Sequence, residues 1–177
     1  MDDEFRDQVV SLMPRLRAHA TVLMRSSVDA DDLLQDVMVR AWKFRHTFRP
    51  GTNLAAWLFR IMRNQFLTQI RRTTYARQYS GEDWRTEFST LPDQEWKCTY
   101  NELLGALQQI SEPSRQALLL VSACGLTYEE AAYVCDCAPG TIKSRVSRAR
   151  DRVAELMGGR HFDGAIPAPA GAVGVAA

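Results

Sequence analysis

The sequence predicts an all-α fold of two small helical domains joined by a flexible linker. Apolar residues recur at helical spacing along about the first 75 residues, enough for a three-helix bundle. A polar, acidic stretch over residues 78–97 shows no sustained period, and a second helical block follows it. We therefore assign residues 1–77 to the first domain, 78–98 to the linker, 99–158 to the second domain, and 159–177 to a disordered tail rich in Ala, Gly and Pro.

Three helices are expected in the first domain. The first covers residues 4–25, and Pro14 can kink it. The second starts at Asp29 as its N-cap, with Asp31 and Asp32 in the first turn, where the helix dipole favours anions. The third opens near residues 52–53 and runs to about Arg72, with an apolar face opposite a polar one. The apolar face carries Leu54, Leu58, Ile61, Met62 and Gln65, and the polar face Arg60, Arg63, Asn64 and Arg71.

The second domain should contain a helix-turn-helix over residues 126–157. A helix from near Thr99, a break at residues 111–113, and a helix over 115–124 precede it. Thr127 and Glu130 form a capping box for a short helix that starts at Tyr128 and ends near Val134. Residues 135–138 supply the turn. Pro139 suits the first position of the next helix, although Ala138 is a weak N-cap for it.

The helix after the turn has the pattern of a recognition helix. Its buried stripe is predicted to be Ile142, Val146, Ala149, Val153 and Leu156. The opposite face carries Lys143, Ser144, Ser147, Arg148 and Asp151, while Arg145, Arg150 and Arg152 flank it. Arg and Lys donate to guanine O6 and N7 in a major groove, so this face suits DNA. An ordinary amphipathic surface helix is the competing interpretation.

Charge is distributed unevenly along the chain. The formal net charge is only +1, but residues 37–81 contain no acidic residue. A second basic cluster lies at residues 143–152, and acid gathers at 29–36 and 82–102. This asymmetry indicates a polyanionic partner contacted at two places, rather than solvated helix faces alone.

Metal, membrane and catalytic functions find little support in the sequence. The cysteines at 98, 124, 135 and 137 lack C-x2-C spacing and neighbouring histidines, so we expect reduced core cysteines; a redox or metal role is the alternative. We expect no cofactor, no small-molecule substrate and no enzymatic activity. No apolar run reaches the roughly 18 residues that span a bilayer. The acidic start does not resemble a secretory signal, which predicts a cytoplasmic protein.

Two motif blocks resemble the extracytoplasmic-function (ECF) sigma factors of the sigma-70 family. Residues 127–132 and 140–150 are similar to the region 4 helix-turn-helix of that family. Residues 31–42 resemble region 2.2, and residues 48–64 resemble regions 2.3 and 2.4. The P-G-T-N-L-x-A-W-L-F string at 50–59 is similar to the general stress response group of alphaproteobacteria. Pro139 and Ala138 depart from the family pattern.

The resemblance implies a sigma factor that binds core RNA polymerase and directs promoter-specific initiation in a stress response. It implies promoter DNA and an anti-sigma factor as further partners. By the resemblance, core polymerase docks on Asp32, Gln35, Asp36 and Arg40. Asn64 reads the −10 element, and Arg60 and Arg63 contact nearby phosphates. Trp57 and Phe59 are able to stack on bases, but core packing is the expected role of each. Lys143, Ser144, Ser147 and Arg148 read the −35 element, with Thr141 and Arg145 on its backbone.

Two other functions remain open at this point. A sigma-like decoy would sequester an anti-sigma factor without initiating transcription, and we would then expect degraded DNA-facing residues. A two-domain repressor would bind duplex DNA unaided, which leaves the region 2 resemblance unexplained.

Overall fold

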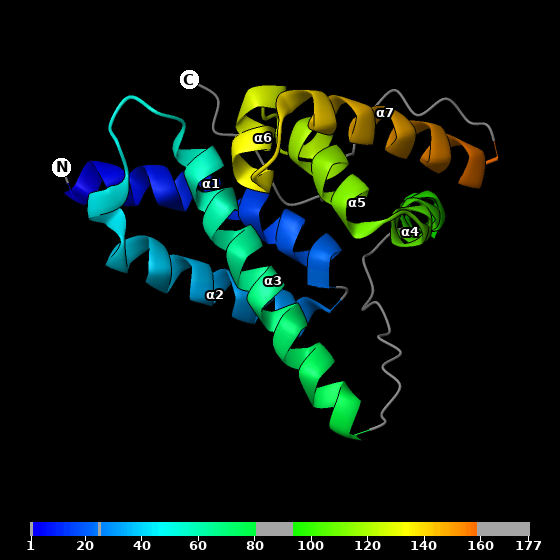
Figure 1. Ribbon diagram of the computed structural model, residues 1–177, viewed down its shortest axis with the longest axis horizontal. Helices are drawn as coiled ribbons and strands as arrows, with labels where there is room; N and C mark the ends of the chain where they lie inside the picture. The colour runs from blue at the N-terminus through cyan, green and yellow to red at the C-terminus, as the bar shows by residue number, and fades with distance from the viewer. Residues whose placement is uncertain (1, 25, 81–93, 159–177) are drawn as a thin grey trace. The chain divides into compact units, whose positions relative to one another are not determined.

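The computed structural model describes residues 2–24, 26–80 and 94–158, and every regular element in those ranges is helical. The chain divides into two compact units, Met1–Ser89 and Thr90–Ala177 (Figure 1). The predicted all-α, two-domain fold is therefore confirmed. The predicted tail and most of the predicted linker lie outside the described residues.

The first unit is a three-helix bundle. It contains α1 (Asp2–Met24), α2 (Ser27–Lys43), the short 3-10 helix η1 (Arg45–Thr47) and α3 (Leu54–Ser80). Each of the three long helices packs against the other two. The apolar stripes meet in one core, whose largest fully buried side chains include Leu16, Leu33, Val37, Leu58, Phe59 and Met62. Pro14 lies inside α1, which continues through it.

The start of α2 corrects one sequence prediction. Ser26, not Asp29, is the N-cap, and its hydroxyl accepts a hydrogen bond from the Asp29 backbone N–H at 3.3 Å. Asp29 therefore occupies the first turn, whereas Asp31 and Asp32 lie beyond it. Both Ser26 and Asp29 are good capping residues, and the earlier one prevails because Ser26 has the extended backbone that a cap needs.

α3 is longer than its sequence pattern predicted. Its start agrees, since the Asn53 side chain accepts hydrogen bonds from the backbone N–H groups of Ala55 and Ala56 at 2.9 and 3.3 Å. Its end lies at Ser80 instead of Arg72. Residues 73–80 contain neither Pro nor Gly, and the first glycine after the turn at 51 is Gly81. A helix without a breaker continues even where its apolar stripe fades.

The second unit holds α4 (Gln94–Gln109), α5 (Glu112–Leu118), the π-helical turn η2 (Leu119–Ala123), α6 (Tyr128–Cys135) and α7 (Pro139–Leu156). α4 begins at Gln94 rather than near Thr99. α5 begins directly after Ser111 rather than at Arg115, because Pro113 is acceptable in a first helical turn. The α-helix gives way at Leu119 to η2, which ends before Gly125, a residue with φ +62°.

The predicted helix-turn-helix is present in α6 and α7. Thr127 Oγ1 accepts from the Glu130 N–H at 3.1 Å, and the Glu130 carboxylate accepts from the Thr127 N–H at 2.9 Å, so the capping box is confirmed. α6 includes Cys135, and Asp136 then reverses the chain in a left-handed conformation (φ 53°). Ala138 makes no side-chain capping bond, as predicted.

Candidate nucleic-acid interface

α7 presents a polar face away from the core of its unit. Ile142, Val146, Ala149 and Val153 are buried against α5 and α6, while Leu156 is only half-buried. Lys143, Ser144, Ser147, Arg148 and Asp151 are all exposed on the other side. The side chains that were predicted to read bases therefore share one accessible helix face. Their basic and hydroxyl groups match the acceptors in a major groove.

The flanks of α7 differ from each other. On one flank, Arg150 Nη2 donates to the Ser122 hydroxyl at 3.2 Å, which ties this arginine to η2. On the other flank, Arg145 Nη1 lies 3.8 Å from Cys137 Sγ, a weak acceptor. Thr141 and Arg145 are half-buried. Arg148 is exposed, and its Nε donates to the Ser144 carbonyl at 3.2 Å.

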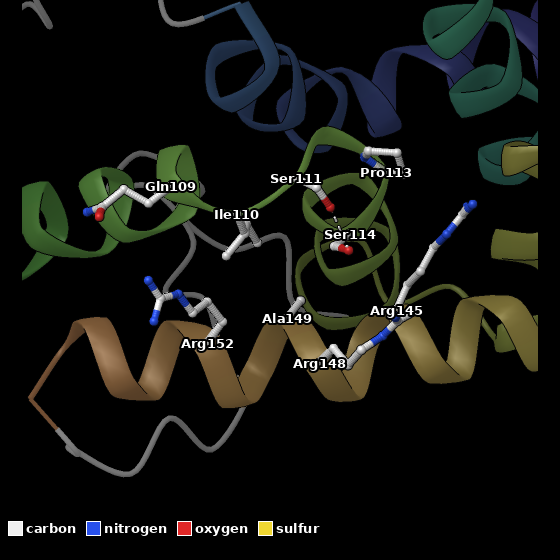
Figure 2. Close-up of a pocket in the computed structure, with 9 residues that line it drawn as sticks. All are labelled: Gln109, Ile110, Ser111, Pro113, Ser114, Arg145, Arg148, Ala149 and Arg152. Atoms are coloured by element: carbon white, nitrogen blue, oxygen red, sulfur yellow. Dashed lines mark hydrogen bonds between the residues drawn. The ribbon is translucent and has the colours of Figure 1, made fainter.

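A groove of about 460 Å³ runs beside α7, and we call it the α7 groove. One wall is formed by α7 itself and the other by the end of α4, the start of α5 and the connection between them (Figure 2). Its lining residues include three arginines and no carboxylate: Gln109, Ile110, Ser111, Pro113, Ser114, Arg145, Arg148, Ala149 and Arg152. The sequence did not reveal this groove, because its two walls lie some 30 residues apart along the chain.

In the first unit, the predicted −10 residues lie on the outer side of α3. Asn64 is exposed, whereas Arg60 and Arg63 are half-buried. Phe59 is buried and its ring meets His19 edge-on, with centroids 5.2 Å apart, so it packs in the core. Trp57 is half-buried, and its ring centroid lies 5.6 Å from that of Phe48 and 6.2 Å from that of Phe5.

The outer face of α2 carries the residues predicted to dock on polymerase. Asp32, Gln35, Asp36 and Arg40 are exposed, opposite the buried Leu33, Leu34, Val37 and Ala41. The same face exposes Val39 (68%) and Trp42 (49%), which the sequence reasoning missed. The signal was available, since both are apolar residues that fall off the buried stripe of a helix.

An ion pair links α1 and α2 beside this face. Arg17 Nε and Nη2 donate to the two Asp31 carboxylate oxygens at 2.8 and 3.0 Å. The hydrogen bonds from Arg17 lower the pKa of the Asp31 carboxyl, and those bonds raise the pKa of Arg17 in return. Asp31 precedes the exposed Asp32, so the pair joins α1 to α2 at the start of the predicted docking face.

Neither metal-binding side chains nor membrane spans are indicated in the described parts of the chain. Groups of three or more His, Cys, Asp or Glu side chains with metal-binding arrangement are absent from those residues. Cys124 and Cys135 are buried and Cys137 is half-buried, while the Cys98 side chain lies outside the described residues. No described helix combines the length and apolar character needed to cross a membrane.

Comparison with known proteins identifies the family. The Sigma-70 region 2 family model matches residues 9–75, and the Sigma-70 region 4 model matches residues 100–153. The ECF RNA polymerase sigma factor EcfG of Rhodopseudomonas palustris is 38% identical over 93% of this chain and 90% of its own length. The chain belongs to the ECF RNA polymerase sigma factors. Its function is that of a sigma factor, which directs transcription from promoters, and the resemblance seen in the sequence is confirmed.

Two further sigma factors are similar to this chain, and one more solved structure shares its fold. The sigma factor CarQ of Myxococcus xanthus is 30% identical over 88% of the chain and 90% of its own length. The Bartonella quintana sigma factor RpoE, solved in complex with the anti-sigma factor NepR, superposes with a TM-score of 0.82 at 39% identity, covering 88% of this chain and 97% of that one. CnrH, solved with the cytosolic domain of CnrY, has a TM-score of 0.69 at 23% identity and shares the fold.

Proposed function

We propose that this ECF sigma factor reads promoters through two separate surfaces, α7 for the −35 element and the outer side of α3 for the −10 element. The exposed basic face of α7, backed by a buried apolar stripe in a capped helix-turn-helix, is the observation that carries the proposal. The chain supplies no catalysis in this proposal, because polymerase forms the RNA. It acts in the cytoplasm, where polymerase and promoter DNA meet.

At the −35 element, Arg148 is the strongest candidate for base recognition. Its Nε is held by the Ser144 carbonyl, so the guanidinium is oriented before DNA arrives. An arginine in this position can donate to guanine O6 and N7 in two bonds. Lys143, Ser144 and Ser147 complete the base-reading face in the proposal, and Thr141 and Arg145 contact the adjoining backbone.

At the −10 element, Asn64 reads an unstacked base through its amide, which offers both a donor and an acceptor. Its exposure on α3 supports this role. Arg60 and Arg63 contact nearby phosphates. A captured base must leave the base stack, so α3 recognises melted DNA in the proposal. α7, by contrast, recognises duplex DNA.

Core polymerase docks on the outer face of α2 in the proposal. Val39 and Trp42 supply an apolar centre, and Asp32, Gln35, Asp36 and Arg40 supply a charged rim. Protein interfaces commonly combine an apolar, aromatic-rich core with a polar rim. The exposed apolar residues therefore favour a protein partner on this face over nucleic acid.

We further propose an anti-sigma partner and a role in a stress response. The similarity to a sigma factor solved with NepR supports such a partner. The decoy alternative is not favoured, because the α7 face and Asn64 keep the side chains that DNA reading needs.

Run-off transcription with core polymerase tests the proposed function. We expect initiation from a promoter with matched −10 and −35 elements. The double variant Lys143→Ala with Arg148→Ala should lose −35-dependent initiation yet bind core normally in a pull-down. A template with a scrambled −35 element is the matched control, and the variant should be no worse than wild type on it. Failure of the wild-type chain to initiate, with tight anti-sigma binding, would favour the decoy.

A further inference from the structure

The α7 groove carries more positive charge than base reading requires. Arg145, Arg148 and Arg152 line one wall, at spacings of three and four residues along α7 (Figure 2). In Figure 2, Arg145 and Arg152 extend from α7 toward the facing wall, to one side of the predicted base-reading face. The facing wall adds the Ser111 and Ser114 hydroxyls and the Gln109 amide.

The geometry of a seated recognition helix determines what this groove would meet. A helix with its side chains is about 10–12 Å wide, and the major groove of B-DNA is about 12 Å wide. A helix lying in that groove therefore has a sugar–phosphate strand close to each side. α4 and α5 both pack against α7, so the connection between them lies beside the recognition helix. Whatever occupies the α7 groove when α7 is seated is then expected to be one of these strands.

The chemistry of the lining agrees with a phosphodiester ligand. Ser111 Oγ donates to Ser114 Oγ at 2.9 Å, which leaves the Ser114 hydroxyl hydrogen to serve as a donor. Guanidinium and hydroxyl groups are the usual partners of DNA phosphate oxygens. Of the apolar lining residues, Ile110 and Ala149 are buried and only Pro113 is exposed, and none of the large exposed apolar side chains of the described residues lines the groove. A protein partner would lack an apolar anchor here, so the lining favours nucleic acid over an acidic peptide.

We propose that the α7 groove binds the backbone of one DNA strand beside the −35 element, with Arg152, Ser111 and Ser114 contacting phosphates. The inference rests on the proposed −35 role of α7 and extends it to a second wall outside the helix-turn-helix. Phosphate contacts carry no sequence information, so the groove would raise affinity and fix register without choosing bases. Arg152 now pairs with Glu155 at 2.8 Å and would exchange or share that partner on binding.

The test measures binding of the holoenzyme, assembled from the full chain, to labelled duplexes at several salt concentrations. One duplex carries a matched −35 element and the other a scrambled one. Ser111→Ala with Ser114→Ala should weaken binding to both duplexes by roughly three- to tenfold and preserve their ratio. Arg152→Gln should do the same and make the slope of log affinity against log salt shallower by about one. Arg6→Gln removes the same charge in the other unit and should change neither quantity.

The proposal would be overturned if both groove variants kept the affinity and the salt slope of the wild type. It would also be overturned if a variant changed the ratio of the affinities for the two duplexes, because that would mean that the groove contacts bases. Loss of anti-sigma binding with DNA affinity intact would assign the groove to a protein partner and reject it as a site for a DNA strand.

If the wild-type holoenzyme binds both duplexes equally, the proposed −35 role fails. The groove variants still decide the groove in that case, because phosphate binding needs no sequence. Ser111 makes no side-chain capping bond to α5, and a melting curve of each variant would show that it folds.

Discussion

At the scale of single residues, His19 stands out as an ionisable side chain in the core of the first unit. It is 6% exposed and its ring meets Phe59 edge-on. Burial lowers the pKa of His19 to about 4, because the charged imidazolium cannot be solvated there. The sequence allowed the histidines to be considered only as possible metal ligands, since burial of His19 depends on how α1 meets α3.

The buried histidine predicts acid sensitivity in the first unit. The unfolded chain binds a proton near pH 6.5 and the folded chain only near pH 4, so the folded state loses stability as pH falls between these values. Between pH 7 and pH 5 we expect a loss of about 2 kcal/mol. Urea titrations followed by hydrogen exchange of α1 amides would measure it. His19→Leu should abolish this pH dependence, and an equal loss in that variant would contradict the assignment.

The Arg17–Asp31 pair leads to a second residue-scale prediction. Both side chains are well exposed, at 61% and 43%, so solvent screens the pair despite its two hydrogen bonds. Asp31→Asn should lower the stability of the first unit by no more than about 1 kcal/mol. Leu33→Ala, two positions away and fully buried, should cost about 2–5 kcal/mol in the same urea titration. A larger effect of Asp31→Asn than of Leu33→Ala would contradict the screening argument.

At the scale of elements, the sequence predicted which segments are helical better than where the helices end. Apolar spacing is a property of each segment alone, and it correctly placed all three bundle helices and both helices of the helix-turn-helix. Ends depend on local competition, as with Ser26 against Asp29 for the α2 cap. The π-helical turn η2 was not predicted, because its segment was expected to continue as an α-helix over 115–124.

The N-terminus of α7 offers a cap that the chain does not use. Ala138 has the extended backbone of an N-cap but no side-chain acceptor, unlike Thr127 at the start of α6. Ala138→Ser should add about 1 kcal/mol to the stability of the second unit, because a serine hydroxyl at the N-cap can accept from a backbone N–H of the first turn. For a unit of this size that raises its melting temperature by roughly 4–8 °C.

Thermal denaturation of the full chain measures this gain. Thr127→Ala, which removes an existing cap, is the matched control and should lower the stability of the second unit by about 0.5–2 kcal/mol. A neutral Ala138→Ser combined with a destabilising Thr127→Ala would show that the Pro139 start already fixes the α7 terminus without a side-chain cap.

At the scale of the whole molecule, uneven charge was the most informative sequence feature. A net charge of +1 conceals two basic clusters, and the structure carries them on different compact units. Their existence could be predicted because it needs only local sequence. The α7 groove could not, since it forms only when residues 109–114 meet residues 145–152. The exposure of Val39 and Trp42 beside the predicted polymerase residues could be predicted in part. It follows from helix geometry once the position of the α2 helix in the sequence is known.

If the two units contact separate elements of one promoter, their contributions to the salt dependence of DNA affinity should add. Arg63→Gln removes a proposed −10 phosphate contact and Arg145→Gln a proposed −35 one. With holoenzyme on a promoter that carries both elements, each should make the slope of log affinity against log salt shallower by about one, and the double variant by about two. Contacts on separate units share no partners, so their free energies should add. On a duplex with only the −35 element, Arg145→Gln should keep its effect and Arg63→Gln should have none. An effect of Arg63→Gln on that duplex would mean that the units do not divide the promoter between them.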